Sequence, residues 1–353
     1  MSQKGYDTVV VGGGVIGLFT AWELTKQGQS VCILERGQFG QEASWAAGGI
    51  LSPLRPWKYP ALVNQLALES QSVYPAICEE LQALSGIDCE WRQSGMLILD
   101  CDEQEQAETW AEQSGQKLEW LSQERLQSDF PDVVASEMHS SACWLPGVAQ
   151  LRNPRLIKSL VTSLEHMGVE CRQAFSVDRL SLRGNRVVGV QSGAEKVFAD
   201  NVVVAAGAWS SKVLADLDSP FCIYPVKGQM LLFAAGVASP GAILMRGNRY
   251  LVPRADGRIL AGSTVEQAGY DKSTDADVLA QIKTDVAAIW PALNEAKIEA
   301  QWAGLRPATE NEVPILGPHP AVEGLYLNTG HFRSGIVMAP ASAKALTSQL
   351  LGQ

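Results

Sequence analysis

The feature that most constrains the fold is a glycine-rich turn near the start of residues 7–36. Three consecutive valines, residues 9–11, favour a buried parallel strand immediately before this turn. The glycines that follow have the spacing GxGxxG and are Gly12, Gly14 and Gly17. Apolar residues recur at helical spacing over residues 15–26, and a second apolar run ends in Glu35. This order predicts one strand–helix–strand unit.

Each glycine has a physical task in such a unit. Gly12 lets the chain turn sharply out of the strand, Gly14 lets the backbone approach a pyrophosphate, and Gly17 lets the helix pack on the sheet. Free N–H groups at the helix start, around Val15 and Ile16, would hold a diphosphate with the positive end of the helix dipole. The pattern indicates a dinucleotide site, although a glycine-rich loop of any α/β protein is the alternative, and it does not separate FAD from NAD.

Glu35 lies at the end of the second predicted strand, 18 residues after Gly17. A carboxylate there can accept hydrogen bonds from both hydroxyls of an adenosine ribose. It would repel a 2′-phosphate, so the sequence disfavours NADP even though Arg36 is adjacent.

Bulk composition excludes several classes of partner. The chain has 353 residues, is 46% hydrophobic and carries a net charge of −10, which fits a soluble protein of two domains and argues against nucleic acid or an anionic membrane surface. Its longest uncharged stretch, residues 8–22, is too short to span a bilayer and is broken by glycines, so we expect neither a membrane span nor a signal peptide.

Cysteine and histidine usage points to a reducing compartment and no metal. Seven cysteines occur without a CxxC pair, and four histidines show no ligand spacing. We therefore expect free thiols, a cytoplasmic location and no metal site.

Small residues crowd the segment after Glu35, in which Trp45 and Leu51 are interleaved and expected to be buried. A flexible linker is one interpretation; the favoured one is backbone laid against a flat ligand. The residues expected to line it are Ala43, Ser44, Gly48, Gly49 and Ile50.

Further along the chain, residues 61–85 predict two helices with a break near Pro75. Residues 120–146 suggest lid or connecting structure. Alternation over residues 249–252 and 258–261 predicts a sheet with one solvent-exposed face, a natural floor for substrate.

The order of elements predicts an α/β (α+β) fold, in which a Rossmann-like FAD-binding domain carries an inserted, largely antiparallel substrate domain. We assign residues 1–82, 146–219 and 306–353 to the first domain, and residues 83–145 and 220–305 to the second.

Six segments in a fixed order carry a resemblance to a known family. They are VVVGGGVIGLFTAWEL, EASWAAGGIL, VVVAAGAWS, RYLVPRADGRILAGSTVE, WAGLRPATENEVPILG and NTGHFRSGIVMAPASAKAL. The chain resembles the FAD-dependent amino-acid oxidases of the D-amino-acid oxidase and sarcosine oxidase superfamily, and most of all the glycine oxidases of bacterial thiamine synthesis. The resemblance implies FAD as cofactor.

The resemblance also implies catalytic roles. Arg306 matches the arginine that clamps the substrate carboxylate, a task suited to a guanidinium fork. Tyr250 matches the tyrosine that meets the same carboxylate, and Arg333 a second arginine near flavin and substrate. Val265 matches a pocket-wall position. A surface arginine at 306 and a plain core tyrosine at 250 remain the alternatives.

Near the C-terminus, the family motif would bring backbone N–H groups and a helix start to the pyrimidine edge of the flavin. Because Pro340 removes a helical donor, we expect the regular helix to begin near Ala339, with residues 335–338 as an irregular turn. The remaining residues that the resemblance assigns to the cofactor are Val177, Gly207, His331, Phe332, Arg333, Ser334, Gly335, Ile336 and Val337.

The implied reaction moves a hydride from the α-carbon of glycine, sarcosine or a small D-amino acid to flavin N5. The imino acid hydrolyses to a 2-oxo acid and ammonia, and oxygen reoxidises the flavin to give hydrogen peroxide. No His, Cys or Lys base is among the matched positions. The sarcosine-oxidase relatives attach flavin through a cysteine placed after the GLRP motif, and this chain has no cysteine after Cys222, so the resemblance implies noncovalent FAD. The family further implies a homotetramer and a possible hand-over of the imine to a thiazole-forming enzyme.

Four alternatives stay open at this stage. The nearest is a D-amino-acid dehydrogenase of the same superfamily that reduces a quinone or a dye. The others are a sarcosine-demethylating oxidase, an inactive flavin-binding subunit, and an NAD-dependent dehydrogenase.

Overall fold

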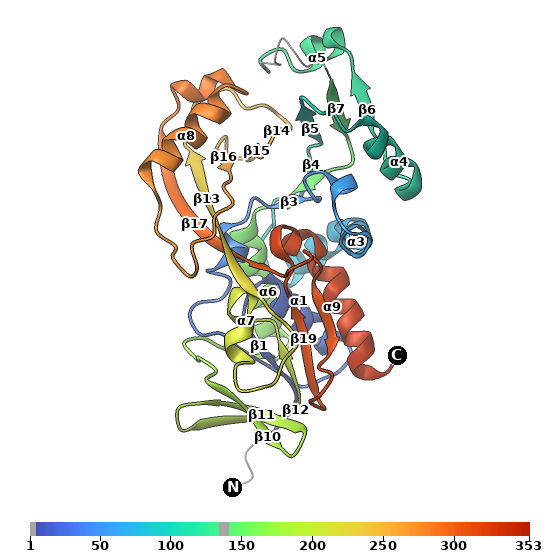
Figure 1. Cartoon of the computed structure of the whole chain (residues 1–353), viewed down its shortest axis with the longest axis vertical. Coiled ribbons are helices and arrows are strands. Elements are labelled where there is room, and N and C mark those ends of the chain that lie inside the picture. The colour runs from blue at the N-terminus through green and yellow to red at the C-terminus, as the bar shows by residue number, and fades with distance from the viewer. Residues whose placement is uncertain (1–4, 134–140) are drawn as a thin grey trace.

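The computed structural model describes residues 5–133 and 141–353 of the chain. It consists of two stacked bodies, with β1, the first described strand, and the C-terminal helix α9 in the lower one and the sheet around β13 and β17 in the upper one (Figure 1). Within the described residues, no helix is long and apolar enough to cross a membrane.

The lower body is built on a sheet whose central strands are parallel. In spatial order its main path is β10 (Arg179–Arg183), β11 (Arg186–Ser192), β12 (Glu195–Val204), β1 (Tyr6–Val11), β2 (Val31–Leu34) and β9 (Glu170–Arg172). Two further strands, β19 (Leu325–Thr329) and β18 (Ile315–Pro318), extend it from β12. The predicted strand–helix–strand unit is therefore present, with β1 at the centre.

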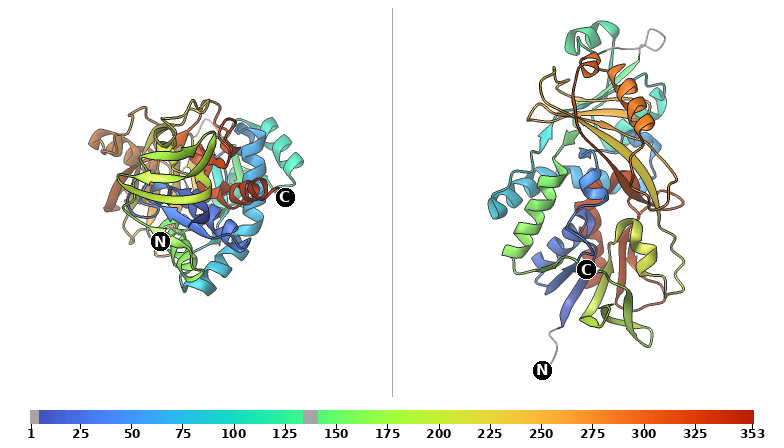
Figure 2. Two further views of the ribbon diagram at one scale, coloured as in Figure 1. Left: turned by 90° about the horizontal axis from the view of Figure 1, so that it is seen from below. Right: turned by 90° about the vertical axis from the view of Figure 1, so that its left-hand side faces the viewer.

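Alternating side chains of β1 cover both faces of this sheet. Val10 packs under the helices, whereas Val9 and Val11 pack with the strands of the β10–β12 region. The helices on the Val10 side are α1 (Val15–Lys26), α3 (Ala61–Ser85), α6 (Asn153–His166) and α9 (Gly335–Leu351). Figure 2 shows α6 and the β10–β12 strands on opposite sides of this body. The continuous apolar run of β1 follows from burial on both faces.

The upper body contains an eight-stranded sheet that is antiparallel except for the β14–β5 pair. Its order is β17 (Ile298–Ala308), β13 (Tyr224–Phe233), β16 (Ile259–Gly262), β15 (Arg249–Pro253), β14 (Ile243–Arg246), β5 (Met96–Leu99), β7 (Ala142–Leu145) and β6 (Glu119–Leu121). Its helices are α4 (Gln104–Ser114), α5 (Gln123–Asp129) and α8 (Ala276–Ala287).

The prediction that one face of this sheet is exposed to solvent is wrong. Leu251 and Ala261 pack on one face in a cluster that includes α8, and Tyr250 and Val252 pack on the other face. Four of the five residues of β15 are buried, with only Arg249 partly exposed. Alternation separated the two faces correctly, but both are covered.

Short elements join the two bodies. A three-stranded sheet has the order β3 (Ile50–Leu51), β8 (Ala149–Gln150) and β4 (Arg92–Gln93). The remaining turns are α2 (Ala43–Ala46), α7 (Ser210–Val213), η1 (Pro56–Lys58), η2 (Gly207–Trp209), η3 (Pro291–Asn294) and η4 (Phe332–Ser334).

Two helix predictions based on proline are wrong. α3 continues through Pro75, because buried residues lie on both sides of it and packing outweighs one missing hydrogen bond. α9 begins at Gly335 rather than near Ala339 and contains Pro340. Proline at 340 leaves the carbonyl of Ile336 without its helical donor, and the hydroxyl of Tyr74 donates to that carbonyl instead.

The predicted lid region contains β6, α5 and β7, so its described parts extend the upper sheet; residues 134–140 lie outside the described residues. The division into the two predicted domains stays a proposal. One of its boundaries, between residues 305 and 306, falls inside β17, so this strand would belong to both domains.

Candidate active site

A cavity of about 490 Å³ lies between the two bodies and reaches from the glycine turn after β1 to the floor formed by β15 and β17. It brings together segments that are far apart in sequence. The predicted site residues that line it are Gly12, Gly14, Val15, Ile16, Glu35, Arg36, Ala43, Ser44, Gly48, Gly49, Ile50, Val177, Gly207, Tyr250, Val265, Arg306, His331, Phe332, Arg333, Ser334, Gly335 and Ile336.

Two predicted residues do not line the cavity. A Cβ at Gly17 would lie 1.9 Å from the carbonyl oxygen of Gly12, so this glycine allows α1 to pack against the turn, as predicted. Val337 is 1% exposed and its side chain packs in the helical core rather than in the cavity wall, so its place beside the cofactor stays a prediction for its backbone alone. α9 has already begun at residue 335, and Val337 lies in its first turn, buried in the helical core.

Backbone geometry explains the glycine turn. Gly12 has φ of +114°, and a Cβ there would lie 2.4 Å from the carbonyl oxygen of Ala205 on the neighbouring segment. A larger residue could not make this turn beside β12.

Glu35 organises the same turn through hydrogen bonds. Its two carboxylate oxygens accept from the backbone N–H groups of Gly13 and Gly37, each at 2.8 Å. The side chain is buried, yet each oxygen keeps a further lone pair for a ligand. Glu35 therefore braces the turn and can also meet ribose hydroxyls.

The start of α1 has fewer free N–H groups than expected. Gly14 is its N-cap and supplies no capping side chain, but the N–H of Val15 donates to Ser44 Oγ at 2.9 Å. Ser44 thus ties the α2 segment to the helix start, and the helix dipole still favours an anion there.

Arg306 stands in the cavity wall with neutral partners. Nη2 donates to Ser263 Oγ at 2.7 Å, and Nη1 donates to the carbonyl oxygen of Thr264 at 2.9 Å. Burial, reinforced by the nearby Arg333 guanidinium, lowers the pKa of Arg306. Within the described part of the chain, Arg306 forms no ion pair with an acidic side chain. Such a cation is suited to bind an anionic group.

Arg333 and Tyr59 extend this charged wall. Arg333 is exposed, and its guanidinium carbon lies 5.2 Å from the centroid of the Phe332 ring. Burial raises the pKa of Tyr59, against the opposing effect of the neighbouring Arg333. The Tyr59 hydroxyl is therefore a neutral donor beside two arginines.

Tyr250 forms the floor of the cavity and is 7% exposed. Its hydroxyl donates to Met230 Sδ at 3.4 Å, a weak acceptor that a ligand oxygen could replace. Above the ring lies Gly48, where a Cβ would be 3.1 Å from Tyr250 Cε2. The lack of a side chain at Gly48 lets this loop lie close against the ring.

Sequence reasoning missed several lining residues, because their proximity depends on long-range packing. Ser263 and Tyr59 hold or flank the arginines, and Trp209 stacks under Arg36 with 3.5 Å between guanidinium carbon and ring centroid. Trp209 belongs to the motif VVVAAGAWS, so its position was signalled although its contact was not.

His331 in the cavity wall has one paired and one unpaired ring nitrogen. It is 2% exposed, and its Nε2 is 3.0 Å from Ser342 Oγ. Its Nδ1 has no hydrogen-bond partner among the described residues. Burial lowers the pKa of His331 to about 3, so the imidazole is neutral.

Comparison with known proteins places the chain in a family. The model of the DAO family, described as FAD dependent oxidoreductase, matches residues 7–349. The chain belongs to this family. The oxidoreductase is 42% identical over 346 residues to the glycine oxidase of Pseudomonas putida, which covers 98% of this chain and 94% of that protein.

Solved structures agree with this placement. The oxidoreductase superposes on the crystal structure of glycine oxidase from Geobacillus kaustophilus with a TM-score of 0.92 at 29% identity, covering 99% of this chain and 95% of that chain. It is also 31% identical to the bifunctional protein ThiO/ThiG of Trichormus variabilis, covering 98% of this chain and 53% of that protein.

The cavity of the oxidoreductase fits FAD. Gly12, Gly14 and Gly48 line it without side chains, and His331 presents an unpaired buried nitrogen in its wall. No cysteine is among the described residues that line the cavity, in keeping with noncovalent binding. Glu35 and the start of α1 would hold the adenosine diphosphate part, and residues 331–336 would hold the flavin.

Proposed function

We propose that this oxidoreductase is a glycine oxidase, which deaminates glycine and other small amino acids such as sarcosine and small D-amino acids. The observation that carries the proposal is Arg306, a partly buried cation in the cavity wall whose described partners are neutral oxygens. A cavity that would hold FAD and presents such a cation is suited to an amino acid, whose carboxylate completes the arginine.

We propose that Tyr250, Arg306 and Arg333 are the catalytic residues. Arg306 binds the carboxylate through two N–H donors, and the Tyr250 hydroxyl leaves Met230 to donate to the same group. Arg333 adds positive charge at the open side of the cavity, and Val265, 47% exposed, forms part of its rim. This arrangement fixes the α-carbon and turns it toward the cofactor.

FAD, when bound, supplies the redox chemistry by accepting a hydride from the α-carbon and passing the electrons to oxygen. The described cavity wall contains neither a cysteine nor a charged imidazole close to the arginines, and His331 is held neutral by burial. A substrate with a neutral amine therefore needs no general base from the protein. The contribution of the chain is orientation and electrostatics.

We propose oxygen as the electron acceptor and thiamine synthesis as the setting. The likeness to a bifunctional protein named ThiO/ThiG supports hand-over of the imine to a thiazole-forming enzyme. A cytoplasmic location and a homotetramer complete this proposal, the first in keeping with seven free cysteines in the described chain.

Oxygen consumption by the purified yellow protein tests the function. We expect uptake and hydrogen peroxide with at least glycine, tested beside sarcosine, D-alanine and D-proline. An artificial electron acceptor is run in parallel. Dye reduction by D-alanine without oxygen uptake from any of the four would replace the oxidase with the dehydrogenase.

A further inference from the structure

Arg254 follows β15 and ties three segments together. Its Nη2 donates to the carbonyl oxygen of Gly48 at 2.9 Å. Its Nη1 donates to the carbonyl oxygen of Leu151 at 2.9 Å and to Gln150 Oε1 at 3.3 Å. One guanidinium thus joins the end of β15, the loop of residues 47–49 (the glycine loop) and the end of β8.

The glycine loop is held by its carbonyl groups. The Ala47 carbonyl accepts from Asn153 Nδ2 at 2.6 Å, the Gly48 carbonyl from Arg254, and the Gly49 carbonyl from the N–H of Leu151 at 2.9 Å. Only the middle bond comes from the segment directly after β15, the strand that carries Tyr250. Arg254 is therefore the direct link between Tyr250 and the backbone that faces its ring.

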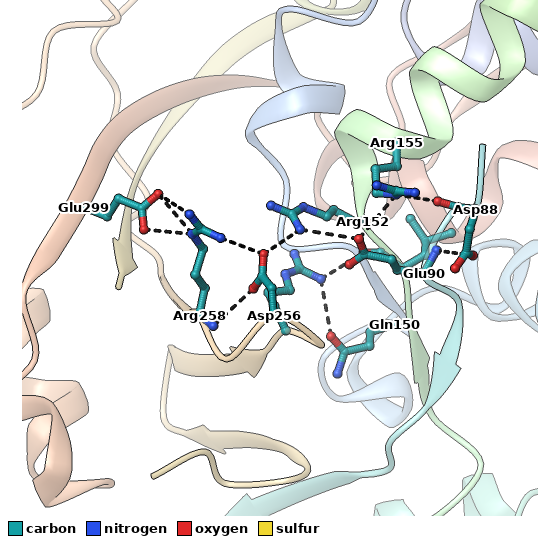
Figure 3. A network of polar contacts seen from close by, with 10 residues as sticks. Asp88, Glu90, Gln150, Arg152, Arg155, Asp256, Arg258 and Glu299 are labelled. Atoms are coloured by element: carbon teal, nitrogen blue, oxygen red, sulfur yellow. Dashed lines mark hydrogen bonds and ion pairs between the residues drawn. The ribbon is translucent and has the colours of Figure 1, made fainter. Parts of the chain in front are cut away.

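The acidic groups nearby are engaged with other arginines. Figure 3 shows Arg258, Asp256, Arg152 and Glu90 joined in one chain of contacts. Asp256 pairs with Arg152 at 2.7 Å and with Arg258 at 2.8 Å, and Glu90 pairs with Arg152 at 3.4 Å. The hydrogen bonds of Arg254 go instead to neutral oxygens.

This arrangement has an energetic cost that calls for a role. Burial lowers the pKa of Arg254 to about 10, and Arg152 lowers it further, while Glu90 and Asp256 oppose the shift. The group stays charged at neutral pH, with carbonyl and amide acceptors arranged around its planar fork. A fork that bridges several acceptors is a rigid spacer, which a single ammonium can replace only in part.

We propose that Arg254 is a positioning residue of the active site, which holds the Gly48 loop at a fixed distance from the Tyr250 ring and so sets how the substrate α-carbon meets the cofactor. The inference rests on the proposed amino-acid oxidase function for its effect on rate. Its geometric part, the fixed loop beside the flavin region, is independent of the substrate.

The test compares the holoenzyme with the variants Arg254→Met and Arg254→Lys, and with Arg258→Met as the matched control. Arg258 lies in the same turn but contacts only Asp256 and Glu299 among described side chains. Three quantities are measured: the visible circular dichroism of the resting flavin, the Kd of glycolate as a carboxylate probe, and the anaerobic rate of flavin reduction at saturating glycine.

We expect Arg254→Met to change the resting flavin spectrum and to slow reduction by on the order of tenfold to a hundredfold. The glycolate Kd should stay within about threefold, because the donors of Arg306 are untouched. Arg254→Lys should recover part of the rate, and Arg258→Met should match wild type throughout.

Three outcomes would overturn the inference: an unchanged rate in Arg254→Met, equal losses in Arg254→Met and Arg258→Met, or a loss confined to glycolate affinity. If glycine fails to reduce the wild-type flavin, the proposed function fails instead. The circular dichroism spectrum of the resting flavin then tests the positioning role separately. If Arg254→Met leaves that spectrum unaltered, the positioning role is excluded as well.

Discussion

Gly228 of β13 lies directly against the guanidinium of Arg306. A Cβ at residue 228 would be 2.2 Å from Nη2 and 2.5 Å from Cζ of that arginine. The two residues are on paired strands, with Gly228 opposite Gly304 and Arg306 opposite Val226. A residue without a side chain is therefore needed for the arginine to lie flat along the strand and reach Ser263.

We expect Gly228→Ala to displace Arg306 and raise the KM for glycine about tenfold to a hundredfold. Arg306→Ala sets the upper limit on the rise in KM, because removing one partner of a desolvated charge contact costs about 2–5 kcal/mol, or about one and a half to three and a half orders of magnitude in KM. Steady-state oxygen uptake measures both. Gly147→Ala is the control, since the nearest atom to a Cβ there is Gln116 Oε1 at 3.6 Å. A normal KM in Gly228→Ala would contradict this role for the glycine.

Glu35→Gln should weaken FAD binding. The carboxylate accepts two backbone N–H groups, and an amide can accept only one of them while aiming a donor at the other. We expect the Kd of the apoprotein for FAD to rise on the order of tenfold to a hundredfold, measured by quenching of flavin fluorescence. Glu112→Gln on the exposed face of α4 should leave the Kd unchanged. Equal affinities in the two variants would exclude Glu35 from cofactor binding.

Local sequence patterns predicted the nucleotide end of the site. The turn at Gly12, the strand β1 and the acid at Glu35 are neighbours within one unit, so spacing and residue type sufficed. The resemblance supplied Arg306 and Tyr250, and the structure places both in one cavity. Their supports, Ser263 and Gly228, come from strand pairings across the inserted sheet that local periodicity does not encode.

Tyr74→Phe should destabilise the fold without touching the cavity. The hydroxyl of Tyr74 donates to the Ile336 carbonyl, which Pro340 deprives of its helical donor. Removing the hydroxyl leaves the buried Ile336 carbonyl unpaired and lowers the free energy of unfolding by about 1–3 kcal/mol. Urea unfolding measures the change. Tyr326→Phe is the control, because among the described residues the Tyr326 hydroxyl makes no hydrogen bond to a side chain or backbone group. Equal stability in Tyr74→Phe and wild type would show that the carbonyl finds another donor.

This pair also explains why the helix start was misjudged. Pro340 by itself favours a late start for α9, since proline removes one donor. The compensating hydroxyl is that of Tyr74 in α3, 262 positions before Ile336, and nothing in the sequence of either helix indicates this contact. Proline-based breaks therefore fail where a distant side chain satisfies the carbonyl.

His331 should make stability fall in acid. Its pKa is about 3 in the folded chain because of burial, and about 6.5 in the unfolded chain. The unfolded state thus binds more protons between these values, so the contribution is complete above about pH 6.5 and is lost as pH falls toward 3. The slope is on the order of 1 kcal/mol per pH unit. Urea unfolding of wild type and His331→Gln across pH 4–8 measures it, and an identical pH dependence in both would refute it.

The most direct measurement is anaerobic mixing of the purified yellow protein with glycine, followed by the flavin absorption band. We predict that glycine bleaches the band, that methylamine leaves it unchanged because it has no carboxylate for Arg306, and that Arg306→Ala bleaches only at far higher glycine concentrations. A band that persists with glycine, or one bleached equally by methylamine, would contradict an amino-acid oxidase whose substrate is held by Arg306.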